Sequence, residues 1–524
     1  MEKIAIIYVN LPGMTKRLQA LSSPEGMEVQ LYPVVPRGNL AMAFQRAMKH
    51  AQARYKVYIS EDIAILRQDL LSDILAAFQS HPEIGLLGLS GTNRILTSGF
   101  TYLSPQRVGF VRTADGTLLP GESVSELCPV QALDGYFLAT QQNLDWRRDV
   151  VHGSLFLGVS ASCEYRRAGC GVAVLAQEMP VCQLLGASFS AENREQASVL
   201  REYALDLYPL VSIVIPTYQR PSLFQQALAS AAGQTYHNLD IFVTDNSHND
   251  ETKQVYERQF ASDQRIHYEH HPDFDAAGNW QCAIAYDNPK ADYVNWLMDD
   301  DLFHPEKIAT MMDYFFQNPD VTLVTSYREL IDEDGNVLPD ASWSGPVFEK
   351  TSHVAGDEMG RAMLVHTWNL VGEPTTALVK KSAMQNHRLG WTGKEGKYLI
   401  SDFPTWLCAL SHGNIIYLRE PLSSFRQHPG QQVKSDLMYV TGMICWGMML
   451  REALVRGVFL RKDEDKRQAV VHWLALASEA LQRFTKQPEL WNKPQFCDFL
   501  TVYAALAAAL ANGYKIAFDI DTGA

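Results

Sequence analysis

An apolar stretch that ends in three consecutive carboxylates limits most strongly how this chain can fold. Residues 293–298 (YVNWLM) have the composition of a buried β-strand, and Asp299, Asp300 and Asp301 follow directly. Three adjacent like charges repel one another unless a cation lies among them. Because carboxylate oxygens are hard ligands, the pattern favours Mg²⁺ or Mn²⁺, with an anion such as a diphosphate completing the coordination shell. A solvated acidic turn is the alternative.

Two stretches of the chain open the same order of elements. Residues 3–9 (KIAIIYV) and 211–215 (VSIVI) are β-branched runs followed by helical patterning. Each is followed by a further strand that ends in acidic residues, at 56–59 and at 293–298. Strands alternating with helices predict an α/β fold with a largely parallel sheet, whose ligands collect at the carboxyl strand ends. We therefore expect two α/β domains of similar design in tandem.

The length of the chain, 524 residues, agrees with more than one domain. We expect the two α/β domains to cover residues 1–200 and 205–435, with a polar, helix-prone linker within 188–209. Residues 436–524 have helical periodicity and alanine-rich runs, which predicts a C-terminal helical region. That region carries no obvious chemistry, so we expect it to serve packing or contact between copies of the chain.

Composition limits the partners and the compartment. The formal net charge of −14 argues against binding to nucleic acid, and the eight cysteines show no metal-binding spacing, which favours a reducing cytoplasm. The N-terminus has the pattern of a first strand and lacks the layout of a signal peptide. The apolar run at 437–450 is shorter than the ~20 residues that a membrane span requires. We expect a cytoplasmic protein, with peripheral contact to the inner face of the membrane left open.

A loop suited to a nucleotide follows the strand at 211–215. The sequence there continues as PTYQRP, and a helix is expected from about Ser222, so free N–H groups and a positive dipole end face the loop. The next strand, 240–244, ends at Asp245, whose carboxylate suits hydrogen bonds from a base or a ribose. A helix cap or a turn is the alternative for this acidic cluster.

Residues 210–430 resemble the family 2 glycosyltransferases, which have the GT-A fold. The matching segments, in order along the chain, are VSIVIPTYQRP, TDNSHND, the helix start at Gly278-Asn279-Trp280, NWLMDDDLFHPEKI and PLSSFRQHPGQ. The resemblance implies transfer of a sugar from a nucleotide-sugar donor, most simply a UDP-sugar, with inversion at the anomeric carbon. It also implies a set of nucleotide-binding residues: Pro216, Thr217, Tyr218, Arg220, Asp245, Asn279 and Asp300.

The same resemblance assigns a metal site and a catalytic base. Asp299 and Asp301 would be the DxD pair that holds Mn²⁺ or Mg²⁺ and the diphosphate, with His428 as a further metal ligand and Arg426 as a phosphate contact. Asp402, just before an apolar helix, is the expected base for the acceptor hydroxyl, and a helix N-cap is its alternative role. Glu373, in a loop that lies beside the acceptor in relatives, is the reserve base.

Residues 1–187 are similar to a second, divergent glycosyltransferase-like family of GT-A type. The similarity rests on the expected helix at 40–53, on YKVYISED at 55–62 and on LDGYFLAT at 133–140. Relatives carry metal-ligand side chains near positions 155–158 and 182–185, where this chain has LFLG and CQLL. We expect a non-catalytic domain that positions the acceptor; a bifunctional enzyme with a second transferase site stays the competing hypothesis.

Two other functional classes compete with the transferase. A sugar-phosphate nucleotidylyltransferase needs a glycine-rich loop after its first strand, and residues 216–221 contain no glycine. A carbohydrate-binding scaffold made of two decayed domains is opposed by the intact aspartate cluster and Asp402. By family analogy alone, the acceptor would be a glycan hydroxyl in surface polysaccharide or glycoprotein assembly.

Overall fold

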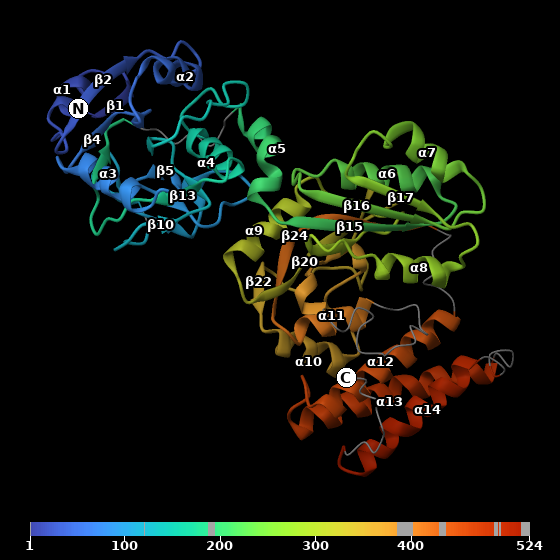
Figure 1. Ribbon diagram of the computed structural model, residues 1–524. Coiled ribbons are helices and arrows are strands. Elements are labelled where there is room, and N and C mark those ends of the chain that lie inside the picture. The colour runs from blue at the N-terminus through green and yellow to red at the C-terminus, as the bar shows by residue number, and fades with distance from the viewer. Residues whose placement is uncertain are drawn as a thin grey trace. The chain divides into compact units, whose positions relative to one another are not determined.

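The computed structural model in Figure 1 describes residues 2–119, 121–186, 194–384, 402–428, 436–486, 491 and 494–514. The chain divides into two compact units, Met1–Tyr208 and Pro209–Ala524. Part of the expected linker, residues 187–193, lies outside the described residues. Helix α5 (Gln196–Leu207) covers the rest of that linker and packs on α4 (Leu157–Arg167) of the first unit, where Tyr203 and Ser160 share a hydrogen bond of 2.7 Å.

A seven-stranded mixed sheet forms the centre of the first unit, in the order β10-β13-β5-β12-β3-β1-β2. Its strands are β1 (Glu2–Val9), β2 (Met27–Val34), β3 (Tyr55–Ile59), β5 (Ile84–Gly88), β10 (Cys128–Pro129), β12 (Phe137–Thr140) and β13 (Gly171–Val174). All five residues of β3 (YKVYI) are buried, Lys56 included, as its central place in the sheet predicts. Only β10 and β12 run against the other five strands.

Short helices and two small sheets complete the first unit. The helices besides α4 and α5 are α1 (Met14–Gln19), α2 (Leu40–His50) and α3 (Leu70–Ser80). The small sheets combine β11 (Ala132–Leu133), β6 (Gly91–Thr92) and β7 (Arg107–Val108), and β4 (Ile63–Ile65), β14 (Cys182–Leu184), β8 (Val111–Arg112) and β9 (Leu118–Leu119). Helix α2 begins where Asn39 accepts a 2.8 Å hydrogen bond from the N–H of Met42, an ordinary N-cap.

A ten-stranded mixed sheet forms the centre of the second unit, with the main order β17-β16-β15-β18-β23-β20-β24-β19. Its strands are β15 (Leu210–Thr217), β16 (Leu239–Asp245), β17 (Ile266–His270), β18 (Ala291–Trp296), β19 (Leu302–Phe303), β20 (Val321–Ile331), β21 (Val337–Leu338), β22 (Ser352–Val354), β23 (Leu378–Lys380) and β24 (Asn414–Arg426). Strand β21 pairs with β20, and β22 pairs with β24.

The two sheets share one strand order. The series β2-β1-β3-β12-β5-β13 in the first unit corresponds to β16-β15-β18-β23-β20-β24 in the second, in spatial order, in sequence order and in direction. In each, one antiparallel strand, β12 or β23, separates parallel strands on either side. The expected tandem of two similar α/β units is therefore present. The shared order also gives each strand end and connecting helix of one unit a counterpart in the other.

Helices cover both faces of the second sheet. They are α6 (Pro221–Ala232), α7 (Glu251–Gln259), α8 (Ala276–Ala285), α9 (Lys307–Gln317), α10 (Gly356–His366) and α11 (Asp402–Leu410). In Figure 1, α6 and α7 lie over one face of β15, β16 and β17, and α8 lies over the opposite face. Pro221 at the first position of α6 explains why that helix starts there, since proline has no N–H to leave unpaired.

The C-terminal region is helical, as the sequence predicts, and it shares the core of the second unit. It contains α12 (Asp436–Arg456), α13 (Asp463–Lys486) and α14 (Pro494–Ala511). One hydrophobic cluster includes Trp406 of α11 together with Trp446 of α12 and Trp473 of α13. The predicted fold class, two tandem α/β units with mixed sheets followed by C-terminal helices, is confirmed.

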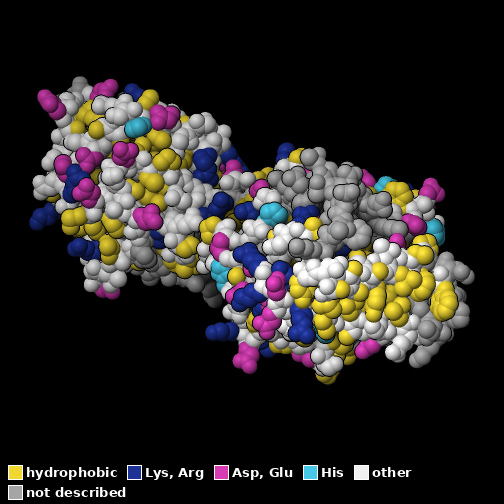
Figure 2. Space-filling model, turned by 90° about the horizontal axis from the view of Figure 1, so that it is seen from below, with side chains coloured by type: hydrophobic (Ala, Val, Ile, Leu, Met, Phe, Trp, Pro, Cys, Tyr) yellow, Lys and Arg dark blue, Asp and Glu magenta, His cyan; other side chains and the backbone are white. Residues whose placement is uncertain are grey.

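Helix α14 has an unusually apolar composition for a surface helix. Among the described residues it is the single helix long and apolar enough to cross a membrane by length and composition, with a mean hydropathy of 1.3 and 22% of it buried. Its exposed side chains include Leu500, and Val471 is exposed on α13. Figure 2 shows hydrophobic side chains gathered in a broad area on the face seen from below.

Close packing of α12 against its neighbours generates a stability prediction. A Cβ atom at Gly447 would meet Val502 Cγ1 at 2.4 Å and Trp473 Cζ2 at 2.5 Å, so α13 and α14 approach the α12 backbone directly. We expect Gly447→Leu to lower the free energy of unfolding by about 1–3 kcal/mol through overpacking. Urea denaturation measures it, with Ala508→Leu on the exposed face of α14 as the control. Equal stability of both variants would contradict this packing.

Candidate active site

Three strand ends of the second unit meet at one edge of its sheet. Strand β15 ends at Thr217 and β16 at Asp245, while β18 ends at Trp296, three residues before the aspartates. Strand β15 pairs in parallel with both neighbours, so the three carboxyl ends point the same way. This edge is where open α/β sheets hold their ligands.

Asp299 is buried and fully engaged by the loop after β15. Its Oδ2 accepts from Thr217 Oγ1 at 2.9 Å and from the N–H of Tyr218 at 3.3 Å, and its Oδ1 accepts from Arg220 Nη1 at 3.1 Å. Burial, and next the charge of Asp300, raise the pKa of Asp299 to about 6, although Arg220 opposes the shift. Asp299 therefore ties the aspartate turn to the nucleotide-type loop.

Asp301 is equally buried and joins the other half of the sheet. Its Oδ2 accepts from Thr375 Oγ1 at 2.6 Å, and its Oδ1 accepts from the N–H of Arg426 at 3.1 Å. Thr375 belongs to a 3₁₀ turn, Pro374–Thr376, just before β23, and Arg426 ends β24. Burial, and next the charge of Asp300, raise the pKa of Asp301.

Asp300, which lies between these two anchored aspartates, points toward His428. Its Oδ2 accepts from Arg220 Nη1 at 2.9 Å and lies 3.0 Å from His428 Nε2. Within the described residues no hydrogen bond reaches its Oδ1, and the Asp300 side chain keeps 15% of its surface exposed. The structure thus brings together all three predicted metal ligands, Asp299, Asp301 and His428, and leaves Asp300 as the carboxylate with an open oxygen.

This donor set fits a divalent cation. Asp300 and His428 supply an oxygen and a nitrogen ligand, which suit Mn²⁺ or Mg²⁺, and the buried Asp299 and Asp301 add negative charge around them. The raised pKa values of Asp299 and Asp301 have the physical cause that a bound cation would relieve, namely buried negative charge. A cation at this turn would be held directly by Asp300 and His428.

The loop after β15 presents the remaining predicted nucleotide contacts. Pro216 is half-buried near the end of β15. Tyr218 is 42% exposed, and its ring meets that of His248 edge-on, with the ring centroids 5.7 Å apart. Gln219 has a φ of 50°, a left-handed conformation that is strained for glutamine, and its N–H donates to Ser247 Oγ at 2.8 Å.

Two other predicted nucleotide residues are used inside the protein. Asp245 is fully buried, and its carboxylate accepts from the N–H of Ser247 and from the hydroxyl of Tyr268. Asn279 accepts from Thr244 Oγ1 at 2.7 Å and donates to the carbonyl of Thr217 at 3.2 Å. Both side chains therefore hold strand ends in position, and any contact they make with a nucleotide would come from that same edge.

The two predicted bases come from different elements: Asp402 begins α11, and Glu373 precedes the 3₁₀ turn that contains Thr375. Oδ2 of Asp402 accepts from Asn369 Nδ2 at 3.3 Å. Burial raises the pKa of Asp402 to about 7, with the charge of Glu373 adding to the shift. Glu373 Oε1 forms an ion pair of 2.8 Å with Arg328 Nη2. The charge of Glu373 also raises the pKa of Asp301, so Glu373 lies within electrostatic reach of both Asp402 and the aspartate cluster.

Comparison with protein families matches both units. Residues 212–377 match the model described as glycosyl transferase family 2, and residues 8–203 match the one described as glycosyltransferase like family. The second unit carries a family 2 glycosyltransferase domain. The match contains Asp299, Asp300, Asp301 and Glu373, whereas Asp402 and His428 lie beyond its end.

Proteins similar to this chain include named glycosyltransferases. An uncharacterized glycosyltransferase of Rickettsia felis is 34% identical over 145 residues, which are 26% of this chain and 23% of that protein. The GalNAc(5)-diNAcBac-PP-undecaprenol beta-1,3-glucosyltransferase of Campylobacter jejuni is 26% identical over 181 residues, 34% of this chain and 54% of that protein. The similarity thus spans between a quarter and about half of these relatives.

Solved glycosyltransferase structures resemble the chain distantly. S. aureus TarS has 13% sequence identity and a TM-score of 0.41, covering 59% of this chain and 54% of that one. The mannosyltransferase PcManGT from Pyrobaculum calidifontis, in complex with GDP-Man and Mn²⁺, has 14% identity and a TM-score of 0.32, covering 58% and 86%.

Sequence reasoning missed three residues that position the site of the family 2 domain. Thr375 anchors Asp301, Asn369 joins Asp402 to the carbonyl of Gly372, and Arg328 holds Glu373. Thr375 stands two residues after Glu373, in the loop that the resemblance places beside the acceptor, so a signal existed there. Asn369 and Arg328 show no such signal, because the acids that they bind, Asp402 and Glu373, are 33 and 45 residues away in the sequence.

Arg426 has a different place from the expected phosphate contact. It is fully buried, and its guanidinium donates to the carbonyls of Asp300, Asp332 and Glu333 at 2.8–3.0 Å. These bonds fix the backbone beneath the aspartate turn. The prediction that Arg426 holds a phosphate is wrong for the described conformation, because its guanidinium donates its hydrogen bonds to protein carbonyls.

A buried lysine supports the same turn from below. Lys307 is inaccessible to solvent, and its Nζ donates to the carbonyl of Thr376 at 2.8 Å, next to the threonine that binds Asp301. Burial lowers the pKa of Lys307 well below its usual range.

The lysine gives a pH-dependent stability prediction. Since its pKa is depressed in the folded state, the folded protein binds fewer protons than the unfolded chain, so stability rises with pH up to the ordinary lysine pKa. The slope is at most about 1.4 kcal/mol per pH unit. We expect Lys307→Met to remove this contribution, as measured by urea unfolding at about pH 7 and about pH 9. Lys290→Met, at an exposed position, is the control; parallel pH curves for wild type and Lys307→Met would contradict the prediction.

Proposed function

We propose that the second unit is an inverting glycosyltransferase that moves a sugar from a UDP-sugar to a hydroxyl of a glycan acceptor. The observation that carries this proposal is Asp402, a partly buried acid with a pKa of about 7 that lies beside Glu373, whose charge also acts on Asp301 of the aspartate cluster. A base poised near neutral pH on one side and a diphosphate site on the other are what a single-displacement sugar transfer needs.

The aspartate cluster would hold the donor diphosphate together with Mn²⁺ or Mg²⁺. Asp300 and His428 are the direct ligands in this proposal, while Asp299 and Asp301 contribute negative charge and fix the turn. The bound cation would act as a Lewis acid that neutralises the leaving diphosphate. Tyr218 and Arg220 would contact the nucleotide from the β15 loop, with Pro216, Thr217, Asp245 and Asn279 shaping that pocket.

Asp402 would take the proton of the acceptor hydroxyl. As the acceptor oxygen bonds to the anomeric carbon, the bond from that carbon to the phosphate oxygen breaks, its electron pair leaves on the nucleoside diphosphate, and the proton moves to the Asp402 carboxylate. Attack opposite the leaving group inverts the anomeric configuration. Glu373 is the poorer base because Arg328 pairs with it, so we assign Glu373 the role of raising the pKa of Asp402.

For the first unit we propose a non-catalytic role in holding the acceptor. At the end of β3, Asp62 forms an ion pair with Arg17, which leaves Glu61 without an acidic cluster around it. Helix α4 is the counterpart of α11, and it starts at Leu157 where α11 has Asp402. A cavity of about 370 Å³ remains at the carboxyl strand ends, lined by Ser60, Asn39, His152, Ser154 and Glu195 among others. These polar groups, free of lysine and arginine, suit sugar hydroxyls better than a diphosphate.

The setting that we propose is glycan assembly in the cytoplasm. The relative in Campylobacter jejuni is named for transfer to an undecaprenol-linked glycan, which is consistent with an acceptor presented at a membrane. Helix α14, with its apolar composition, is the element of the described chain that would approach such a surface.

Donor binding is the first test. A UDP-sugar with Mn²⁺ is expected to stabilise the full chain by about 2.7 kcal/mol at a hundredfold excess over its dissociation constant, measured by thermal shift beside GDP- and TDP-sugars. Asp300→Asn should remove the metal-dependent part, because it takes away the open ligand oxygen. The matched control, Glu61→Gln in the first unit, should keep the full shift. If no nucleotide sugar stabilises the chain with Mn²⁺ or Mg²⁺, the proposal that the second unit is a glycosyltransferase is refuted.

Asp402 is the second test. Asp402→Asn should lower hydrolysis or transfer of the UDP-sugar by about 10²–10⁴-fold and leave donor binding intact. In the wild type, activity should rise with pH and level off above about 7, where Asp402 is ionised. Glu373→Gln should move that limb to lower pH, since it removes the neighbouring negative charge. Full activity in Asp402→Asn, with loss in Glu373→Gln, would instead identify Glu373 as the base.

A further inference from the structure

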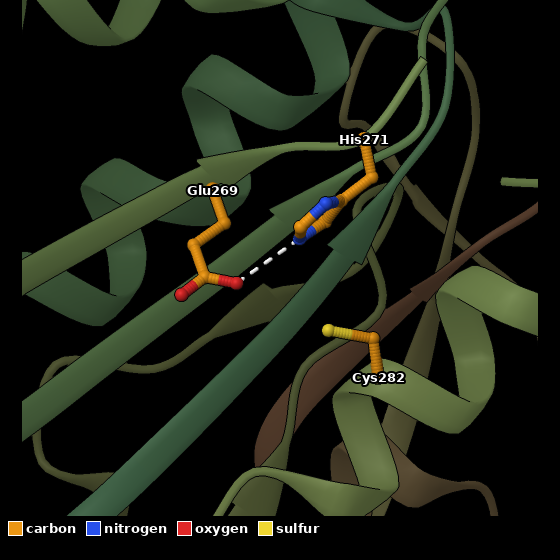
Figure 3. A group of neighbouring side chains, drawn as sticks. All are labelled: Glu269, His271 and Cys282. Atoms are coloured by element: carbon orange, nitrogen blue, oxygen red, sulfur yellow. Dashed lines mark hydrogen bonds and ion pairs between the residues drawn. The ribbon is translucent and has the colours of Figure 1, made fainter. Parts of the chain in front are cut away.

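A second group of metal-ligating side chains lies outside the aspartate cluster of the family 2 domain. Figure 3 shows Glu269 and His271, from the end of β17, converging with Cys282 of α8. One donor atom from each, a carboxylate oxygen, an imidazole nitrogen and the thiol sulfur, lie within 4.8 Å of one another. Residues of three different chemical types thus meet at one point from two different elements.

The sheet register and the turn after β17 bring Glu269 and His271 to the same side. Glu269 pairs with Thr244 of β16, whose side chain bonds Asn279 of α8, so Glu269 points to the face of the sheet that α8 covers. Figure 3 shows His271, the residue after β17, turned toward Glu269 and Cys282. Tyr268 lies on the opposite face, where its ring stacks on Tyr256 of α7. Cys282 reaches the same face from α8, one turn beyond Asn279, which contacts Thr244 of the sheet. The convergence therefore follows from regular geometry.

The imidazole is held in a defined orientation. His271 Nε2 lies 3.0 Å from Glu269 Oε2, and the ring stacks on Phe274 with centroids 4.5 Å apart and planes 13° apart. The backbone N–H of His271 also donates to the carbonyl of Asp245 at 2.7 Å. Both side chains stay open to solvent, with 28% of His271 and 54% of Glu269 exposed, so an ion can enter.

We propose that Glu269, His271 and Cys282 form a Zn²⁺ site with three protein ligands and an open fourth position. Zinc takes thiolate, imidazole and carboxylate ligands in this number, whereas the hard ions Mg²⁺ and Mn²⁺ avoid sulfur. On binding, the Cys282 thiol gives its proton to solvent. His271 loses its hydrogen bond to Glu269 and binds the metal through Nε2, while its ring proton stays on Nδ1. The site is chemically distinct from the aspartate cluster, which offers only oxygen and imidazole.

Zinc here would brace the donor pocket. The ion would link the end of β17 to α8, across the connection of residues 271–275 in which Asp275 caps α8 through a 2.7 Å bond from the N–H of Gly278. Helix α8 carries Asn279, which holds the carbonyl of Thr217 next to the aspartate turn. A fixed α8 keeps that strand end in place, independently of whether the proposed transfer occurs.

Cobalt substitution tests the site directly. The full chain, stripped of metal and kept in excess Mg²⁺ to occupy hard-ligand sites, is titrated with Co²⁺ and then with Zn²⁺. We expect about one equivalent of Co²⁺ with a thiolate-to-cobalt charge-transfer band, which Zn²⁺ abolishes. Cys282→Ser should lose the band and weaken Zn²⁺ binding at least about tenfold. The control Cys497→Ser, at an exposed cysteine of α14, should keep both.

His271→Ala supplies an independent arm, with metal-free thermal unfolding to verify that the variant is folded. It should retain a cysteine but bind Zn²⁺ more weakly than the wild type. Absence of a charge-transfer band in the wild type, or wild-type affinity in both Cys282→Ser and His271→Ala, overturns the proposal. None of these readouts uses sugar transfer, so failure of the zinc site and failure of the proposed function are separable.

Discussion

The hydrogen bonds from two threonines to buried aspartates hold the second unit's site together. Thr217, at the end of β15, donates to Asp299, and Thr375, ahead of β23, donates to Asp301. A buried carboxylate without such donors would be too costly to keep ionised. Because these strands come from opposite sides of β18, the two bonds fix the aspartate turn relative to the whole sheet. The exposed oxygen of Asp300 is available only because its neighbours are held inward.

The repeated strand order shows how one framework serves two different ends. In the first unit the acid after β3 is neutralised by Arg17, and the helix that corresponds to α11 starts without an acid. In the second unit three carboxylates remain together, and α11 starts with Asp402, whose pKa is raised. The framework decides where ligands collect, while a few side chains at strand and helix ends decide the chemistry.

Local sequence was sufficient for the elements and for the edge where the site lies. The run at 3–9 became β1 and the run at 211–215 became β15, because β-branched residues at buried positions favour strands wherever they occur. The expected strand at 293–298 ends earlier, at Trp296, so that the chain can turn the aspartates toward Thr217. The C-terminal helices were equally visible from their period, although their shared core with α11 was not.

The sequence by itself determined two α/β units, the acidic strand end and Asp402 before an apolar helix, since each of these depends on neighbouring residues. Only the tertiary structure decided which carboxylate stays open and that Arg426 donates to backbone carbonyls. It also decided that Glu269, His271 and Cys282 converge. These facts depend on contacts between distant positions: Thr375 and Asp301 are 74 residues apart, and Asp300 and His428 are 128 apart. No local pattern encodes such a pair, because its energy arises only when the sheet brings its members together.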